Sequence, residues 1–183
     1  MTREEALKFV KEKIQNKNLV RHCLSVEAVM KELAKYFNEN SEKWALAGLL
    51  HDIDYEETKD IPEKHSLLGA EILQQHGVDP EIITAVKAHN EIHGLPREEK
   101  ITKALFCSDP ITGLIVAATL VMPDKKIVNL SAENVLNRYK TKGFAQGANR
   151  ETIATCKELG LSLEEFVKIS LTAMQNISNE LGL

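Results

Sequence analysis

Residues 49–58 read LLHDIDYEET, an apolar run that passes directly into a histidine and a carboxylate. A helix that faces a protein core normally ends in a cap and a turn. This run ends instead in His51-Asp52, and Asp54, Glu56 and Glu57 follow closely. A buried charge without a partner costs several kcal/mol. The doublet therefore lies either in water at the rim of the fold or beside a partner inside it.

Helical spacing of apolar residues surrounds this stretch. Ser41 is expected to cap the helix that carries the doublet, with Gly48 and His51 on one face. A preceding helix is predicted from Leu19 to Phe37, and His22 lies on its apolar stripe. Both helices thus bring a histidine to the side that faces the core.

The same pattern recurs downstream. Pro62 suits the first turn of a helix that presents His65, and the pair Asp79-Pro80 suits the start of another that presents His89. A longer helix is predicted from near Glu98, with Asp109 on its apolar stripe and a bend at the following proline. Each helix therefore interrupts its apolar face with one polar residue.

The ends of the chain are also helical in pattern. A capping box of Thr2 and Glu5 starts a first helix, and a box of Ser162 and Glu165 starts the last. No strand pattern, internal repeat or linker is evident. We therefore expect an all-α helical bundle that forms a single domain over residues 1–183.

Composition limits the class of protein. The 183 residues are 43% hydrophobic, enough to bury a core, and 23 basic against 27 acidic side chains give no overall basic character for nucleic acid. Three cysteines without a C-x-x-C pair favour a reducing compartment. The opening residues do not look like an export leader, and residues 110–123 are read as a buried helix. We expect a cytoplasmic protein that binds neither nucleic acid nor membrane.

Six polar residues on apolar helical faces form the candidate site. A single such histidine is usually a core residue whose hydrogen bonds are satisfied. The free-energy cost of burying six unpartnered groups, however, would exceed the roughly 5 to 15 kcal/mol by which a domain is stable. Mutual His–Asp hydrogen bonds, solvent in a cleft and a metal ion are the three possible solutions. Imidazole and carboxylate ligands suit iron, manganese or another borderline divalent ion. The six are His22, His51, Asp52, His65, His89 and Asp109.

A histidine, a His-Asp doublet and a later aspartate resemble the signature of the HD superfamily of metal-dependent phosphohydrolases. The resemblance covers about residues 19–120, which implies a core of the HD-domain type there and a C-terminal helical extension at 121–183. The resemblance implies that His22, His51, Asp52 and Asp109 hold a first ion, and that His65 and His89 join Asp52 at a second ion. That set is most similar to binuclear members such as bacterial symmetrical dinucleoside tetraphosphate hydrolases. The lysine of the HDIGK form and the GYP motif of cyclic dinucleotide phosphodiesterases are both missing here.

By this resemblance, the expected function is hydrolysis of a phosphate ester or anhydride, with a nucleotide as the small-molecule substrate. His51 and Asp52 are the expected catalytic residues. One or two divalent ions are expected to activate water. Fe or Mn is the expected metal, and Mg, Zn, Ni and Co are alternatives. Two other readings stay open: a di-iron oxygenase of the same superfamily, and a metal-dependent nucleotide-binding module without turnover.

The surroundings of the site are less specific. A basic cluster could bind phosphate, although an ordinary solvated helix face has the same composition, and the acidic residues after the doublet suit a solvated loop. One further histidine could be a metal ligand, a proton donor or a rim residue, and the rim is favoured. These candidate substrate residues are His93, Arg138, Lys140, Lys142 and Arg150.

Overall fold

The computed structural model describes residues 1–183, which form helices joined by turns, with no strand. The predicted all-α fold class is confirmed. In chain order the elements are α1 (Arg3–Lys13), α2 (Lys17–Tyr36), α3 (Ser41–Leu50), α4 (Tyr55–Thr58), α5 (Leu67–Gln75), α6 (Pro80–Ala88), η1 (Glu91–His93), α7 (Lys100–Leu120), η2 (Ile127–Asn129), α8 (Ala132–Lys140), α9 (Arg150–Ala154), η3 (Thr155–Leu159), α10 (Leu163–Gln175) and α11 (Ser178–Leu181).

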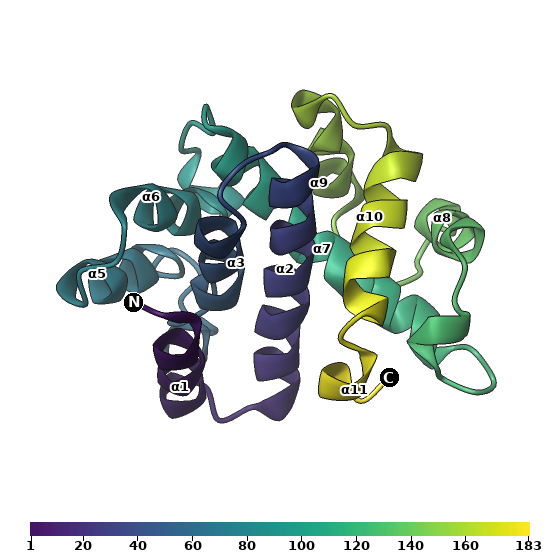
Figure 1. Cartoon of the computed structure of the whole chain (residues 1–183), viewed down its shortest axis with the longest axis horizontal. Helices are drawn as coiled ribbons and strands as arrows, with labels where there is room; N and C mark the ends of the chain where they lie inside the picture. The colour runs from purple at the N-terminus through teal and green to yellow at the C-terminus, as the bar shows by residue number, and fades with distance from the viewer.

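Helix α2 is the centre of the bundle. It stands between α3 and α10, and α7 passes behind it (Figure 1). The α2–α3 pair is the most extensive helix contact of the molecule. A Cβ atom on Gly48 would lie only 2.7 Å from the carbonyl oxygen of Val26, so glycine is what allows these two backbones to approach so closely.

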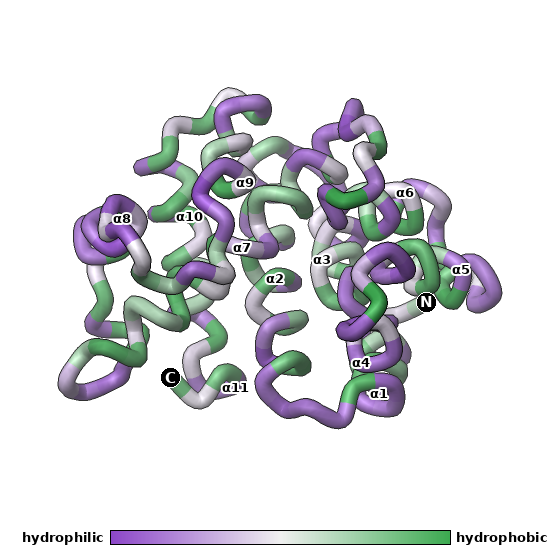
Figure 2. Tube along the Cα trace, turned by 180° about the vertical axis from the view of Figure 1, so that it is seen from behind, coloured by the Kyte–Doolittle hydropathy of each residue, from purple (hydrophilic) through white to green (hydrophobic).

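One hydrophobic core joins the N-terminal and C-terminal helices, because its contiguous buried residues extend from Ala6 to Leu181. Helices α8, α9 and α10 all pack against α7. Seen from behind, α8 is largely hydrophilic, as expected of an outer helix (Figure 2). Helix α7 is long and apolar enough to cross a membrane by composition, but 67% of its most apolar window is buried among the other helices.

Several predicted boundaries shift. The cap of α3 is Asn40, whose side chain accepts hydrogen bonds from two backbone N–H groups, and Ser41 is the first helical residue. Helix α5 begins at Leu67, so the predicted start at Pro62 is wrong and His65 lies in the preceding turn. The chain changes direction there at Ser66, which has a positive φ of 70°. Helix α7 continues without interruption through Pro110.

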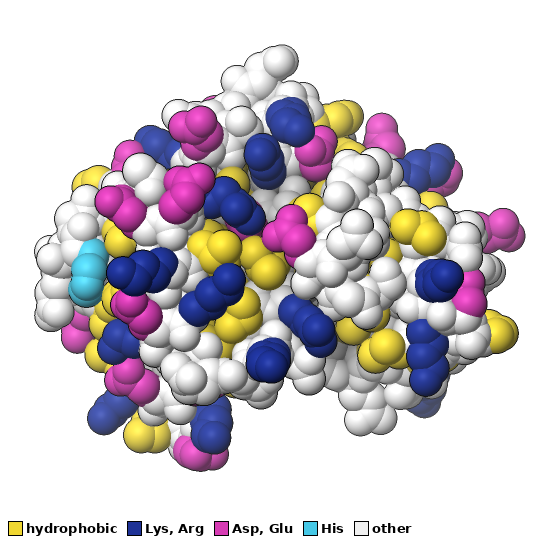
Figure 3. Space-filling view, turned by 60° about the horizontal axis from the view of Figure 1, so that its bottom comes forward, with side chains coloured by type: hydrophobic (Ala, Val, Ile, Leu, Met, Phe, Trp, Pro, Cys, Tyr) yellow, Lys and Arg dark blue, Asp and Glu magenta, His cyan; other side chains and the backbone are white.

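Surface charge is mixed on the face shown in Figure 3. Basic and acidic side chains are interspersed there around a strip of hydrophobic side chains (Figure 3). With a formal net charge of −4 for the chain, this face carries no field of a single sign.

Candidate metal centre

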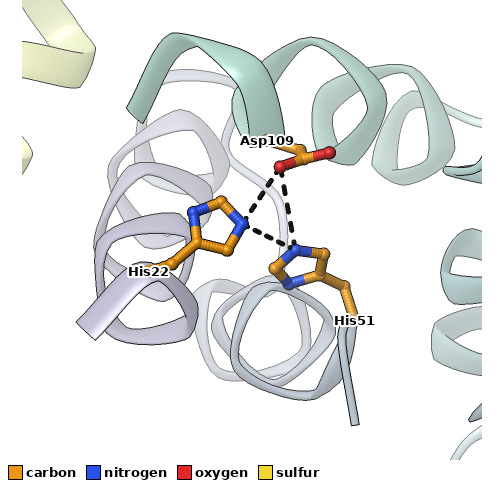
Figure 4. Close-up of side chains that lie close together, drawn as sticks. All are labelled: His22, His51 and Asp109. Carbon is orange, nitrogen blue, oxygen red and sulfur yellow. Dashed lines mark hydrogen bonds and ion pairs between the residues drawn. The ribbon is translucent and has the colours of Figure 1, made fainter. Parts of the chain in front are cut away.

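A first cluster joins α2, the end of α3 and α7. His22 lies in the second turn of α2, His51 directly follows α3, and the side chains of these histidines and Asp109 point toward one another (Figure 4). The Nε2 atom of His22 lies 3.0 Å from Oδ1 of Asp109 and 3.2 Å from Nε2 of His51. Oδ2 of Asp52 lies 3.6 Å and 3.5 Å from these two nitrogens.

A second cluster lies on the other side of the same aspartate. The Nε2 atoms of His65 and His89 are 3.2 Å apart. Oδ1 of Asp52 lies 3.4 Å from the first of them and 3.6 Å from the second. Asp52 therefore turns one carboxylate oxygen to each cluster. All six ligands proposed from the sequence come together in this region.

The opposite ring nitrogen of every imidazole has a partner. Nδ1 of His51 lies 2.8 Å from the carbonyl oxygen of Gly48, and Nδ1 of His89 lies 2.6 Å from that of Val86. Because a carbonyl only accepts, both Nδ1 atoms must carry the proton. In the neutral ring, Nε2 then carries no proton, and its lone pair faces the cluster. This tautomer is the form that binds metal through Nε2.

The two remaining imidazoles are held by side chains. Nδ1 of His22 lies 3.2 Å from Oγ1 of Thr112, whose hydroxyl donates to the carbonyl of Asp109, so Thr112 accepts from the imidazole. Nδ1 of His65 lies 3.1 Å from Oδ1 of Asp54. Both contacts again place the ring proton on Nδ1, so that Nε2 carries a free lone pair.

Burial and charge act against each other in the cluster. Burial lowers the pKa of His51 to about 4. Burial also opposes the charge on His22 and His89, but hydrogen bonds and the charges of Asp109 and Asp52 raise their pKa values above the usual range. Burial would raise the pKa of both aspartates, yet the surrounding imidazoles hold each pKa below its usual range. The carboxylates are therefore ionised at neutral pH.

The spacing fits a divalent ion. An ion with bonds of about 2.1 Å holds adjacent ligand atoms about 3.0 to 3.4 Å apart, and the first cluster spans 3.0 to 3.9 Å. Both clusters offer imidazole nitrogen and carboxylate oxygen, a donor set for iron, manganese or zinc. The side chain of Asp109 is 36% exposed and that of His22 is 24% exposed, so the first cluster is accessible to a small ligand.

Asp54 corrects one expectation. The sequence suited a solvated acidic loop, but the side chain of Asp54 is fully buried. Besides its contact with His65, it accepts hydrogen bonds from the backbone N–H groups of Ser66 at 2.8 Å and Gly69 at 3.0 Å. It thus fixes the turn that carries His65. Its position two residues after Asp52 was the sequence signal for a role at the site. The acidic residues that follow it suggested a solvated loop instead.

His93 lies outside the ligand cluster. Its Nε2 atom lies 2.8 Å from the carbonyl oxygen of His65, so the ring supports the backbone of a ligand residue instead of facing the ligands. This position agrees with the rim reading of His93.

The basic residues of the C-terminal part are placed elsewhere. Arg150 directs its guanidinium to four backbone carbonyls, those of Tyr139, Phe144, Ala145 and Ala148. This geometry opposes the phosphate-binding role that the sequence suggested for Arg150. Arg138 lies over the ring of Phe144, and Lys140 and Lys142 are exposed on the surface. The structure brings none of the four to the candidate metal ligands.

Comparison with known proteins agrees with this site. The HD domain family model matches residues 19–109. Ribonuclease Y of Lawsonia intracellularis is 27% identical over 165 residues, covering 81% of this chain and 32% of that protein. The tRNA (cytidine(56)-2'-O)-methyltransferase of Thermoplasma volcanium is 29% identical over 138 residues, covering 72% of this chain and 39% of that protein.

A third relative is closer to this chain in length. An uncharacterized protein of Methanocaldococcus jannaschii is 36% identical over 116 residues, covering 60% of this chain and 66% of that protein. By contrast, the chain spans only about a third of the length of the Ribonuclease Y relatives. The family match begins three residues before His22 and ends at Asp109, so it encloses all six clustered side chains. The chain belongs to the HD-domain family, with its HD domain at residues 19–109.

Proposed function

We propose that the chain is a metal-dependent phosphohydrolase that acts on a nucleotide. The observation that carries the proposal is the orientation of the imidazoles. The Nε2 atoms of the clustered histidines face each other in two pairs, each 3.2 Å apart, and each Nε2 atom presents a lone pair. One carboxylate oxygen of Asp52 lies beside each pair. Converging lone pairs and carboxylate oxygens repel one another unless protons or cations lie between them.

The ligand sets follow from the two clusters. His22, His51, Asp52 and Asp109 would hold one divalent ion, and His65, His89 and Asp52 would hold a second. When bound, such ions supply a Lewis acid for a phosphoryl group and activate a water molecule near neutral pH. Iron or manganese is the proposed metal, because the donors are imidazole and carboxylate without thiolate.

The protein groups have distinct tasks in this scheme. Asp52 connects the two clusters and brings negative charge to both, and Asp109 leaves one side of the first cluster open to substrate. The Nδ1 contacts with backbone carbonyls, Thr112 and Asp54 hold the rings in place, so that little reorganisation is needed as charge develops on phosphorus.

An RNA phosphodiester is a second candidate substrate. Several relatives are named Ribonuclease Y, and another is named a tRNA methyltransferase. These names favour a nucleic-acid substrate more than the composition of this chain did. The chemistry at phosphorus is the same for a mononucleotide and a strand, so the two candidates differ only in what surrounds the phosphate.

The test combines metal analysis with turnover. Purified protein, its His65→Ala variant and its Asp52→Ala variant are analysed for bound iron and manganese, then assayed on nucleoside monophosphates and on a short RNA. We expect about two metal equivalents in the wild type, about one in His65→Ala, and loss of phosphate-ester cleavage in Asp52→Ala with unchanged helical content. His76→Ala, which removes the one histidine remote from the site, is the control and should keep both properties.

Three outcomes would contradict the proposal. Activity of Asp52→Ala near that of the wild type would remove the metal centre from the reaction. Oxygen consumption that depends on substrate would indicate an oxygenase. Tight nucleotide binding without cleavage by the metal-loaded protein would indicate a binding module.

A further inference from the structure

A cavity of about 210 Å³ adjoins the candidate metal centre. Ligand residues His65, His89 and Asp109 form one side of it. The other side comes from the C-terminal part of the chain, outside the family match, and includes Gly147, Asn149 and Thr152. The C-terminal extension thus forms a wall of the space into which a substrate at the metal ligands would project.

The wall carries polar groups without partners in the chain. Asn149 caps α9, and its Oδ1 accepts from the N–H groups of Glu151 at 2.9 Å and Thr152 at 3.2 Å. Its amide NH₂ makes no hydrogen bond within the protein, so two donor hydrogens are available beside the cavity. The hydroxyl of Thr152, on a residue 8% exposed, is likewise unpaired. Such groups stabilise a bound polar partner.

Arg150 holds this wall in position. Its guanidinium donates to four carbonyls, and the hydroxyl of Tyr139 donates to the carbonyl of Arg150 at 3.0 Å. These bonds fix the turn that contains Gly143 and Ala145, both with positive φ, and that leads into Asn149. The polar groups are therefore held on a fastened segment.

The lining favours an uncharged ligand group. No lysine or arginine lines the cavity, whereas Glu91 and Asp109 do, so additional phosphate would be repelled. Phe106 and Pro110 supply an apolar surface. The volume lies below the roughly 300 to 1,000 Å³ of typical ligand pockets, which suits a single sugar or base.

Given the proposed function, on which this step rests, we infer that the cavity receives one ring of the nucleoside part of the nucleotide, its sugar or its base. In this arrangement the phosphate lies at the metal ligands, and Asn149 donates a hydrogen bond to the sugar or base. Asn149 and Thr152 are thus specificity-determining residues contributed by the C-terminal extension.

Asn149→Asp tests this inference, because aspartate is as good a helix cap as asparagine but removes both donors and adds negative charge. Binding to the manganese-loaded protein is measured by calorimetry with two probes: inorganic phosphate, and a phosphonate analogue of AMP whose P–C bond resists hydrolysis. We expect Asn149→Asp to weaken the AMP analogue about tenfold and leave phosphate within about twofold. Thr152→Val should weaken the analogue less.

Asn40→Asp is the matched control, since Asn40 also caps a helix through Oδ1, at the end of α3 opposite His51. It should change neither affinity. A dinucleotide with the same P–C replacement is measured in parallel, and the probe that loses more affinity in Asn149→Asp identifies a mononucleotide or a strand as the source of the nucleoside. Equal affinity of wild type and Asn149→Asp for both nucleotide probes would overturn the inference, whereas failure of wild type to bind phosphate would overturn the proposed function instead.

Discussion

Each imidazole of the candidate centre is oriented by a second contact, and these contacts are of two kinds. His51 and His89 donate to carbonyls three residues earlier in their own chain segments, so helix geometry alone supplies their support. His22 and His65 depend on the side chains of Thr112 and Asp54, which lie on other segments. The side-chain contacts of His22 and His65 can be removed by mutation, because a side chain can be changed without breaking a helix.

Asp54→Asn should weaken the second cluster selectively. The new amide would keep the shape but place donor hydrogens against the N–H groups of Ser66 or Gly69, or against Nδ1 of His65. We expect affinity for the second metal equivalent to fall about 10- to 100-fold, and the free energy of unfolding to fall by about 1 to 3 kcal/mol. Metal titration and urea denaturation measure the two effects. Asp60→Asn, at an exposed residue of the same segment, should change neither.

Metal affinity should fall on acidification beginning near neutrality. An imidazole must lose its Nε2 proton to bind an ion, and the pKa values of His22 and His89 are raised above the usual range in the metal-free protein. A raised pKa means that protons compete at a higher pH than they do with an ordinary imidazole, so affinity should already begin to decline above the usual imidazole range. His51, with a pKa lowered to about 4, does not compete there. Competition with a chromophoric chelator measures the profile, and a flat profile would contradict it.

The α2–α3 contact is the element on which the first cluster depends. His22 belongs to one helix and His51 directly follows the other, so their Nε2 separation of 3.2 Å requires the two backbones to stay in close contact. Gly48 lies at this contact and also supplies the carbonyl that holds His51. Packing and site geometry therefore share one residue.

Gly48→Ala should separate the helices, because its Cβ would lie 2.7 Å from the carbonyl oxygen of Val26 and 2.8 Å from the backbone nitrogen of Glu27. Neither is a side chain that can rotate away. We expect a loss of about 1 to 3 kcal/mol in the free energy of unfolding, together with weaker metal binding. Gly113→Ala is the matched control within α7, where a Cβ meets nothing within 4 Å. It should gain up to about 1 kcal/mol. Denaturant titration that ranks the two variants equally would refute this.

At the scale of the whole molecule, the candidate centre joins segments distant in sequence. Its side chains come from α2, the ends of α3 and α6, the turn before α5, and α7. An ion held by them would cross-link much of the bundle, and such binding stabilises the folded state over the unfolded chain.

Removal of metal should therefore lower the thermal stability of the entire protein. With free metal about a thousandfold above its Kd, the stabilisation is about 4 kcal/mol, or about 8 to 16 °C in Tm for a chain of this length. Scanning calorimetry with manganese and with EDTA measures the difference. Asp52→Ala, which lacks the residue common to both clusters, should show little or none. An equal Tm in both conditions for the wild type would contradict a tightly bound ion.

The sequence alone determined the fold class and the six clustered side chains. Both follow from local physics: apolar residues at helical spacing define which face is buried, and a polar residue on such a face requires a partner. The pairing of Asp52 with both sets of histidines could be expected only from the resemblance to a family. Its two-sided contacts became visible when the distances between helices were known.

The tertiary structure decided the parts that depend on contacts between distant segments. Asp54 was expected to be solvated, but it is buried in the folded chain and contacts Nδ1 of His65. Arg150 was a candidate phosphate ligand, but its guanidinium donates to four backbone carbonyls, one near the end of α8 and three in the turn that follows it. The wall formed by Asn149 and Thr152 lies 40 or more residues beyond Asp109 in the sequence. Local periodicity specifies which face of a helix is buried, but which groups meet there is set only when the helices pack.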